Sequence, residues 1–171
     1  AAGVAAGTAA DAPARAFYDL GCGAGKAVIL AALHERAGFS RCVGVELLPG
    51  LAAMARGLAA RYRSAADDAA AAARRGHGEA PAATAGVAIV EGDLFEVPLS
   101  DAALVLLNAG CWQEPALSRL RSRMLQALPD GCVLATIRHP LFDDDSEDFV
   151  MLERSSLPMS WGLAPVFLAA R

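Results

Sequence analysis

Residues 17–25 read FYDLGCGAG, and this stretch decides the fold. Apolar residues lead into Asp19, three glycines then alternate with small residues, and an apolar helical stripe begins at Val28. The pattern predicts a strand, a tight glycine turn and the start of a helix. The N–H groups of such a turn and the helix N-terminus form an electropositive cup that a ligand can approach closely. The acid just before the turn favours a ligand with an ammonium group over a pyrophosphate.

The spacing of the glycines argues against a site for a nicotinamide dinucleotide. The fingerprint of such a site is G-x-G-x-x-G. Counted from Gly21 and Gly23, the third glycine falls on Lys26; counted from Gly23 and Gly25, it falls on Val28. The run DLGCGAG instead resembles motif I of the class I S-adenosylmethionine-dependent methyltransferases. An NAD enzyme is therefore the weakest alternative.

The length and charge of the chain limit its organisation. With 171 residues the chain fits one domain, and we expect an alanine-rich, low-complexity N-terminal tail over residues 1–15 and a methyltransferase domain over residues 16–171. The net charge of −4 gives no global basic field, so we expect no strong binding of nucleic acid. The sequence does not begin with Met, and we expect a processed form or a segment of a longer protein.

The cysteine pattern and the apolar runs suggest an intracellular location. Cys22, Cys42, Cys111 and Cys132 are scattered without a C-x-x-C pair, which is typical of reduced thiols. No His/Cys cluster has the spacing of zinc ligands, so we predict no metal site. No apolar run reaches the roughly 18 residues of a membrane span, so we predict no membrane association.

Strand-like and helix-like segments alternate along the chain. We predict strands at 16–20, 41–46, 86–90, 102–107, 132–137, 149–153 and 166–170, and helices at 26–37, from residue 49 onward, and around 117–128. Alternation of this kind predicts an α/β fold with a parallel sheet and right-handed crossovers. The last two strands have no helix between them, which predicts antiparallel pairing. The expected architecture is the Rossmann-like class I methyltransferase fold, a seven-stranded, mostly parallel sheet with an antiparallel last strand.

Two helices carry side-chain patterns that predict their orientation. Apolar residues recur at three- and four-residue steps in the helix after Pro49 and should face the core: Leu51, Met54, Leu58 and Tyr62. The arginines of the later helix should mostly face solvent: Arg119, Arg121 and Arg123.

The polar candidates for a binding site lie where predicted strands end. Ligands in open α/β sheets bind at the carboxyl ends of the strands. Glu46 closes the second strand, 21 positions after Gly25, where an acid can accept both ribose hydroxyls. Asp93 follows the third strand and can accept from an adenine amine, with Leu47 and Leu94 on either side of the ring.

Asn108 and Trp112 are the candidates nearest to the reacting methyl. Asn108 ends the fourth strand, and its amide oxygen or backbone carbonyl could orient an attacking amine or the ammonium group of the ligand. A residue that only ends the strand explains Asn108 equally well. Trp112 could form a wall of the methyl pocket or belong to the core.

Six segments in order carry a more specific resemblance: FYDLGCGAG, CVGVELL, EGDLF, LVLLNAGCW, LPDGCVLATIRHPL and MSWGLAPVFLAAR. From about residue 16 to the end, the chain resembles the disruptor-of-telomeric-silencing type of histone lysine methyltransferase. The resemblance implies S-adenosyl-L-methionine as cofactor, a protein substrate such as a histone, chromatin as the setting and the nucleus as the location; otherwise we expect the cytoplasm. It implies that Asn108 and Trp112 border the lysine channel. The predicted cofactor site comprises Asp19, Gly21, Cys22, Gly23, Gly25, Glu46, Leu47, Asp93, Leu94 and Asn108.

Two further functions stay open from the sequence. The same fold could methylate a small molecule or a protein other than a histone. It could also be a catalytically silent cofactor-binding module, an alternative favoured by Ala109, which stands where the family has a second asparagine. For a lysine substrate no general base is evident, and desolvation of the amine could lower its pKa instead.

Overall fold

The computed structural model describes residues 15–76 and 85–171. The predicted tail therefore lies almost entirely outside the described residues. The strands are β1 (Ala16–Leu20), β2 (Arg41–Glu46), β3 (Gly86–Glu91), β4 (Ala102–Asn108), β5 (Val133–Ile137), β6 (Val150–Met159) and β7 (Gly162–Ala170). The helices are α1 (Lys26–Leu33), α2 (Pro49–Arg74) and α3 (Ala116–Ala127), with short 3₁₀ turns η1 (Glu35–Ala37) and η2 (Ala109–Cys111).

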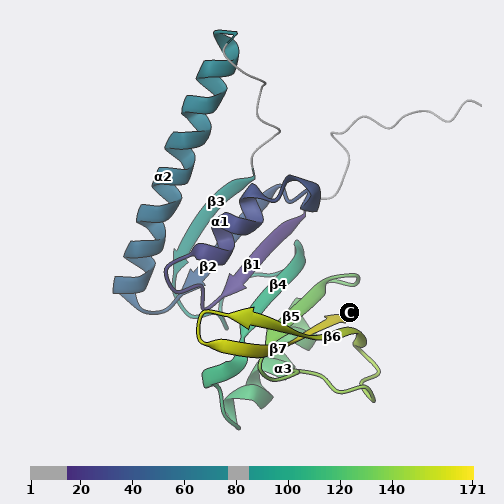
Figure 1. The fold of residues 1–171 in the computed structure, drawn as a ribbon. Helices are drawn as coiled ribbons and strands as arrows, with labels where there is room; N and C mark the ends of the chain where they lie inside the picture. Colours follow the sequence, from purple (N-terminus) through teal and green to yellow (C-terminus); the bar gives the residue numbers. More distant parts are fainter. Residues whose placement is uncertain (1–14, 77–84) are drawn as a thin grey trace, which may run out of the picture.

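The seven strands form one mixed sheet in the order β3-β2-β1-β4-β5-β7-β6 (Figure 1). Strands β1 to β5 pair in parallel, whereas β7 is antiparallel to both β5 and β6. This topology confirms the predicted α/β fold. The chain runs outward from β1 to β3 and then returns to the other side of β1 with β4, so the topological switch point lies at the carboxyl ends of β1 and β4.

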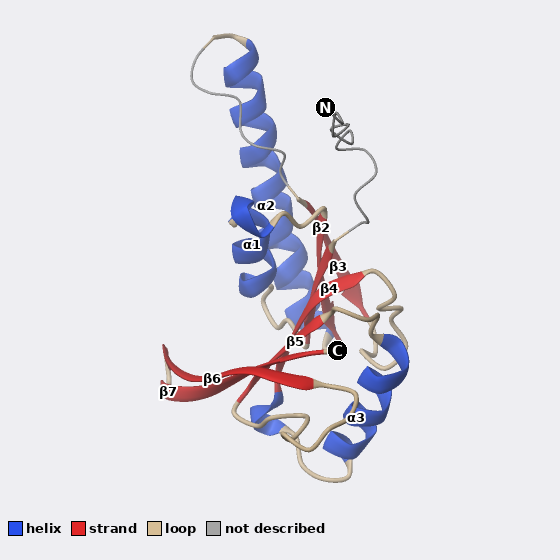
Figure 2. Ribbon diagram, turned by 90° about the vertical axis from the view of Figure 1, so that its right-hand side faces the viewer, coloured by secondary structure: helices blue, strands red, loops and turns tan. Residues whose placement is uncertain are grey.

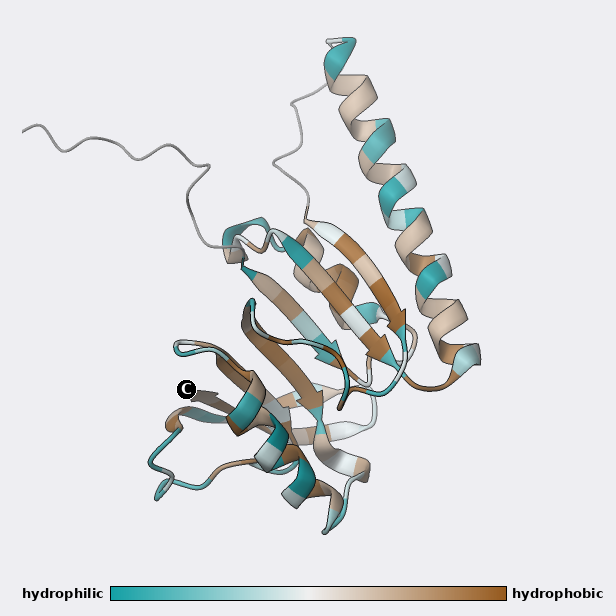
Figure 3. Cartoon of the chain, turned by 180° about the vertical axis from the view of Figure 1, so that it is seen from behind, coloured by the Kyte–Doolittle hydropathy of each residue, from teal (hydrophilic) through white to brown (hydrophobic). Residues whose placement is uncertain are grey.

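Each face of the sheet has its own core. Figure 2 shows α1 and α2 on one side of the strands and α3 on the other. Tyr18 and Leu20 of β1 join the core on the α3 side, while Phe17 joins the core beneath α1 and α2. The alternation follows from the two-residue period of a strand. Apolar strand residues therefore appear in both cores, and Figure 3 shows hydrophobic colour along much of the sheet.

The buried stripe of α2 differs from the prediction. Ala52, Ala55 and Ala59 are buried, whereas Met54 is 61% exposed. A side chain built at Gly25 would meet the Cβ atom of Ala55 at 3.0 Å, so α1 and α2 approach too closely for large residues between them. Steric closeness therefore turns the alanines inward. Of the predicted core residues, Tyr62 does pack against the core, whereas Met54 faces solvent.

Element ends also differ from the predictions. Helix α1 ends at Leu33, and Glu35–Ala37 form η1 instead. Strands β6 and β7 are longer than predicted. Pairing of β7 with β5 ends at Val166, but β6 and β7 stay paired as far as Gly162. The hairpin therefore extends beyond the sheet. Within the two described ranges no helix is both long and apolar enough to span a membrane.

Candidate functional site

The glycine turn folds back onto the end of β2. The N–H groups of Gly21 and Cys22 both donate to the carbonyl of Val45, at 2.8 and 3.0 Å. Gly21 and Gly23 have φ angles of 82° and 55°, in the left-handed region that favours glycine. A side chain built at either glycine would meet no atom within 4 Å, so the backbone is bare on the open side of the turn.

Cys22 faces the core. A side chain built at Gly44 would meet the Sγ atom of Cys22 at 2.7 Å, so the thiol lies directly over the backbone of β2. Burial, reinforced by the carboxylates of Asp19 and Glu46, raises the pKa of Cys22 to about 12. The thiol therefore stays protonated and packs in the core, and only the backbone of Cys22 takes part in the glycine turn.

Glu46 connects three segments at the carboxyl edge. Its Oε2 atom accepts from the N–H of Gly23 at 2.8 Å, and its Oε1 atom accepts from the N–H of Leu48 at 2.9 Å. The carbonyl of Glu46 accepts from the N–H of Gly92 at 3.0 Å. The side chain is buried, so these bonds fix its orientation. Each carboxylate oxygen keeps a second acceptor position for a ligand hydroxyl.

A pocket of about 430 Å³ lies beside Glu46. Six residues of the sequence prediction line it: Gly21, Glu46, Leu47, Asp93, Leu94 and Trp112. The Oδ1 atom of Asp93 accepts from the N–H of Phe95 at 2.9 Å, which orients the second oxygen independently of the turn. Leu94 is almost fully buried, whereas Leu47 is 65% exposed. The structure therefore brings the acids of β2 and β3 into one cavity.

Asp19 lies deeper, beneath the glycine turn. It is 6% exposed and carries a pKa raised to about 7, first because burial disfavours the charged form and second because Glu46 repels a second negative charge. It does not line the pocket. Asp19 is nevertheless close enough to Glu46 to interact with it electrostatically, so both acids lie at the same edge of the sheet, as predicted. A nearby cation would favour the charged form of Asp19.

Asn108 and Trp112 are separated by the turn η2. Asn108 is exposed, and its Oδ1 atom accepts from the N–H of Gly110 at 3.1 Å, which caps η2. It does not line the pocket, whereas Trp112 does. Register pairs Leu20 with Leu107, so Asn108 sits next to Gly21 at the switch point. The two candidate catalytic residues thus border different parts of the edge.

A cation and two rings form the far wall of the pocket; Trp112 was a predicted wall residue, whereas Arg119 and Phe95 were missed by sequence reasoning. The guanidinium carbon of Arg119 lies 3.7 Å from the centroid of the Phe95 ring, and the Phe95 and Trp112 rings meet edge to face at 6.2 Å. The prediction that the arginines of α3 mostly face solvent is confirmed for Arg119, which is exposed, and is wrong for Arg121, which is half-buried. Arg121 donates to the carbonyl of Leu141. The helical period alone carried no signal for these long-range contacts.

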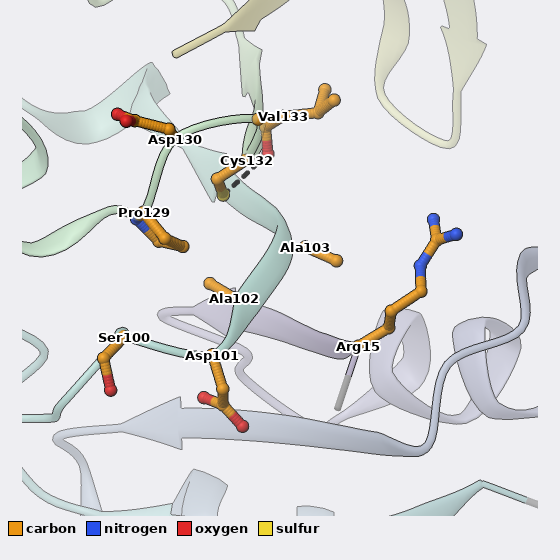
Figure 4. A pocket seen from close by; sticks show the side chains of 10 residues that line it. Arg15, Ser100, Asp101, Ala102, Ala103, Pro129, Asp130, Cys132 and Val133 are labelled. Atoms are coloured by element: carbon orange, nitrogen blue, oxygen red, sulfur yellow. Dashed lines mark hydrogen bonds between the residues drawn. The ribbon is translucent and has the colours of Figure 1, made fainter. Parts of the chain in front are cut away.

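A larger cavity of about 570 Å³ opens at the opposite edge of the sheet (Figure 4). Asp101, Cys132 and Arg15 line it, near the amino ends of β4, β5 and β1. Asp101 is already engaged, because it accepts from the hydroxyl of Tyr18 at 2.8 Å and pairs with Arg41 at 2.9 Å. Ligands of open α/β sheets bind at the carboxyl ends, so the cavity beside Glu46 is the better candidate despite its smaller volume.

Known proteins resemble this chain in fold. No protein-family model matches it, and no curated protein matches it. An RNA methyltransferase from Salinibacter ruber, solved with S-adenosyl-L-homocysteine, is 24% identical, with a TM-score of 0.56 over 90% of this chain and 78% of that one. The rRNA methyltransferase aviRa from Streptomyces viridochromogenes is 17% identical, with a TM-score of 0.55 over 90% and 75%. The mitomycin 7-O-methyltransferase MmcR is 18% identical, with a TM-score of 0.57 over 92% and 49%. The TM-scores over nine-tenths of the chain show that it has the class I methyltransferase fold.

The comparison changes the expectation about partners. The prediction of a protein substrate without strong nucleic-acid binding is wrong, because RNA methyltransferases are among the structures that match along nine-tenths of the chain. Nothing in the comparison points to a histone lysine methyltransferase, so the finer family resemblance, the lysine channel and the chromatin setting are unsupported. The coarser resemblance to class I methyltransferases agrees with the fold.

Proposed function

We propose that this chain is an S-adenosylmethionine-dependent methyltransferase that acts on RNA. One observation carries the proposal: Glu46 and Asp93, from the ends of adjacent strands, line the same pocket as Gly21 of the glycine turn. This brings a ribose acceptor, an amine acceptor and bare backbone together at the topological switch point, where ligands of this class of fold bind.

The residues of the pocket fit the proposed cofactor. Both oxygens of Glu46 accept from backbone N–H groups and retain acceptor positions for the two ribose hydroxyls. The Oδ2 atom of Asp93 has no partner within the described part of the chain and can accept from the adenine amine. Asp19, with its raised pKa, becomes a stable carboxylate when an ammonium group is near. The exposed side chain of Leu47 and the buried Leu94 offer apolar contacts to the ring.

The chemistry asked of this chain is mainly positioning. The cofactor would supply a methyl group on a sulfonium: a nucleophile would bond to the methyl carbon in line as the carbon–sulfur bond breaks, and the neutral thioether would leave with the electron pair. The buried and hydrogen-bonded acids hold a ligand in one orientation, and correct orientation lowers a bimolecular barrier by roughly 7–11 kcal/mol. Asn108, beside Gly21, can orient the incoming nucleophile through its amide group. No proton transfer by this chain is required for a nucleophile that is already neutral.

RNA is the substrate class that the comparisons favour. Two of the similar solved proteins are RNA methyltransferases by name. The MmcR enzyme acts on a small molecule, and the chain spans about half of its length. RNA as substrate is therefore supported by similarity of fold, and it needs a direct test.

The proposal is tested by calorimetry and by methyl transfer. The chain should release heat on titration with S-adenosylmethionine, and Asp93→Asn should weaken the affinity about tenfold, because it removes one charged acceptor worth about 1.4 kcal/mol. The amide keeps an oxygen for the N–H of Phe95, so the turn should persist. Asp67→Asn, on the exposed part of α2, is the matched control.

Labelled methyl groups should then appear in RNA when total cellular RNA, protein and metabolite pools are offered separately. Absence of heat from the parent chain contradicts cofactor binding. Label only in the metabolite pool contradicts the RNA substrate, and binding without label in any pool contradicts the catalytic function.

A further inference from the structure

Arg138 has an unusual backbone at the carboxyl end of β5. Its φ angle is 78°, and within the described part of the chain it is the sole non-glycine residue with positive φ. The N–H of Arg138 donates to the carbonyl of Pro165 at 2.8 Å, which holds this conformation. Left-handed backbone is unfavourable for residues with a side chain and is found preferentially at functional sites. The hydrogen bond to β7 thus maintains a strained backbone at Arg138, which makes this position a candidate for a function.

The side chain of Arg138 lies against η2, next to Asn108. A side chain built at Gly110 would meet the Cδ and Nε atoms of Arg138 at 2.7 and 3.2 Å and the Oδ1 atom of Asn108 at 3.2 Å. Glycine at position 110 therefore leaves the space that the arginine stem occupies. Arg138 is exposed, and it forms no ion pair among residues 15–76 and 85–171. A free guanidinium thus stands beside Asn108 at the carboxyl edge of the sheet.

The hairpin of β6 and β7 extends past the same edge. Ile137 pairs with Val166, and β7 continues for four more residues to Gly162, which projects roughly 13 Å beyond the last pair with β5. Trp161 at the turn is 55% exposed, and Leu163 is 73% exposed. Figure 2 shows the turn between β6 and β7 reaching away from the remaining strands. Residues 155–170 contain no acidic side chain, in a chain whose net charge is −4.

We propose that Arg138 and the turn at Trp161 form the docking surface for a single-stranded segment of the RNA substrate. Arg138 binds a backbone phosphate beside the acceptor nucleotide, and the Trp161 ring stacks on a neighbouring base. An exposed aromatic ring and a free cation on the same projecting part of the edge suit single-stranded nucleic acid, whose phosphates and bases are spread along the strand. Charge complementarity supports the assignment, because Arg138 is an unpaired cation beside a hairpin segment without acidic side chains, whereas Glu46 and Asp93 line the other half of the edge. The inference rests on the proposed function for its choice of RNA.

Binding of RNA tests this surface without any catalysis. The probe is a fluorescein-labelled, mixed-sequence single-stranded RNA of about 15 nucleotides, followed by anisotropy. Arg138→Ala should weaken binding about tenfold and lower the slope of log K against log salt by about one. Trp161→Ala should weaken binding roughly fivefold or more, and Trp161→Phe should restore most of it. Arg36→Ala in η1 and Leu33→Ala on α1 are the controls and should bind as the parent does.

The backbone of Arg138 offers a second readout. Arg138→Gly should raise the melting temperature by about 2–4 °C, because glycine adopts the left-handed conformation without strain, while it weakens RNA binding as Arg138→Ala does. Equal RNA affinity in the parent, Arg138→Ala and Trp161→Ala would overturn the docking surface, and so would a parent chain that binds no RNA.

Calorimetry with S-adenosylmethionine on the same variants separates the two proposals. Unchanged cofactor affinity with weakened RNA binding supports the docking surface. If the parent binds RNA through Arg138 but not the cofactor, the docking surface stands and the proposed methyltransferase function fails.

Discussion

The two halves of the carboxyl edge of the sheet differ in charge and in order. The half formed by β1, β2 and β3 presents Asp19, Glu46 and Asp93, whose side chains are buried or fixed by backbone N–H groups. The half formed by β4, β5 and β7 presents Asn108 and Arg138, both exposed. The first half is a pocket with fixed acceptors, while the second is an open surface with a free cation.

This difference indicates how one edge can serve two ligands of opposite charge. A cationic cofactor with ribose hydroxyls suits the acidic half, since fixed acceptors lose little entropy on binding. A polyanionic substrate suits the other half, since an exposed cationic side chain can adjust its position to bind a phosphate of the substrate. The switch point between β1 and β4 separates the two ligands. Substitutions on one half should therefore leave the ligand of the other half unaffected.

The largest effect is expected from Glu46→Ala on the acidic half. It removes the acceptor for two N–H groups, of Gly23 and Leu48, and should lower the free energy of unfolding by about 2–4 kcal/mol. Affinity for S-adenosylmethionine should fall at least roughly 100-fold, while RNA binding by the folded variant stays within about twofold of the parent. Glu46→Gln keeps the shape and should cost less stability. Retained cofactor affinity in Glu46→Ala would refute the assigned role; denaturant unfolding and calorimetry are the measurements.

A pH-dependent effect is expected from Asp19. Its folded-state pKa of about 7 lies above its ordinary value of 3.8, so the folded chain holds a proton that the unfolded chain releases between these values. Stability should therefore fall as pH rises from about 4 to about 7, by at most about 4 kcal/mol. Asp19→Asn should remove this decline, which melting curves at a series of pH values can measure.

Cofactor affinity should show the opposite trend. In the parent it should strengthen as pH rises from about 5.5 to about 7.5, because the ionised Asp19 attracts an ammonium group. In Asp19→Asn the affinity should be weaker and nearly flat with pH. If cofactor affinity depended on pH in the same way in both proteins, Asp19 would have no electrostatic interaction with the ligand.

The smallest effect is expected from Arg119, at the wall of the pocket. Arg119→Ala removes the cation above the Phe95 ring and should weaken cofactor affinity about threefold, since an exposed cation–π contact contributes about 0.5–1 kcal/mol. Arg119→Lys should retain part of the affinity. Arg61→Ala, exposed on α2, is the control for loss of one positive charge. A loss equal to that of the control would leave the wall without a role in binding.

Sequence patterns predicted the acidic half well because its residues lie in local motifs. Gly21, Glu46 and Asp93 each lie at or just after the end of a strand, and parallel strands bring their carboxyl ends to one edge. Cys22 was included on adjacency alone, and the structure directs its thiol into the core. Adjacency in sequence fixes the position of a backbone but not the direction of its side chain.

The wall and the open half depend on contacts between distant segments. Arg119 and Phe95 are 24 positions apart, and only the packing of α3 on the sheet brings them together. Arg138 owes its conformation to Pro165 and its place to the missing side chain at Gly110. The inward turn of the alanines on α2 likewise follows from the closeness of α1.

By itself the sequence determined the alternation of strands and helices, the reversed last strand and the acids at the strand ends, because these follow from local periodicity and the geometry of parallel crossovers. Only the tertiary structure decided which side chains share a cavity, which cation stays unpaired and how far the last hairpin projects. Those features depend on close packing between segments far apart in the chain, and local patterns contain no information about such distances.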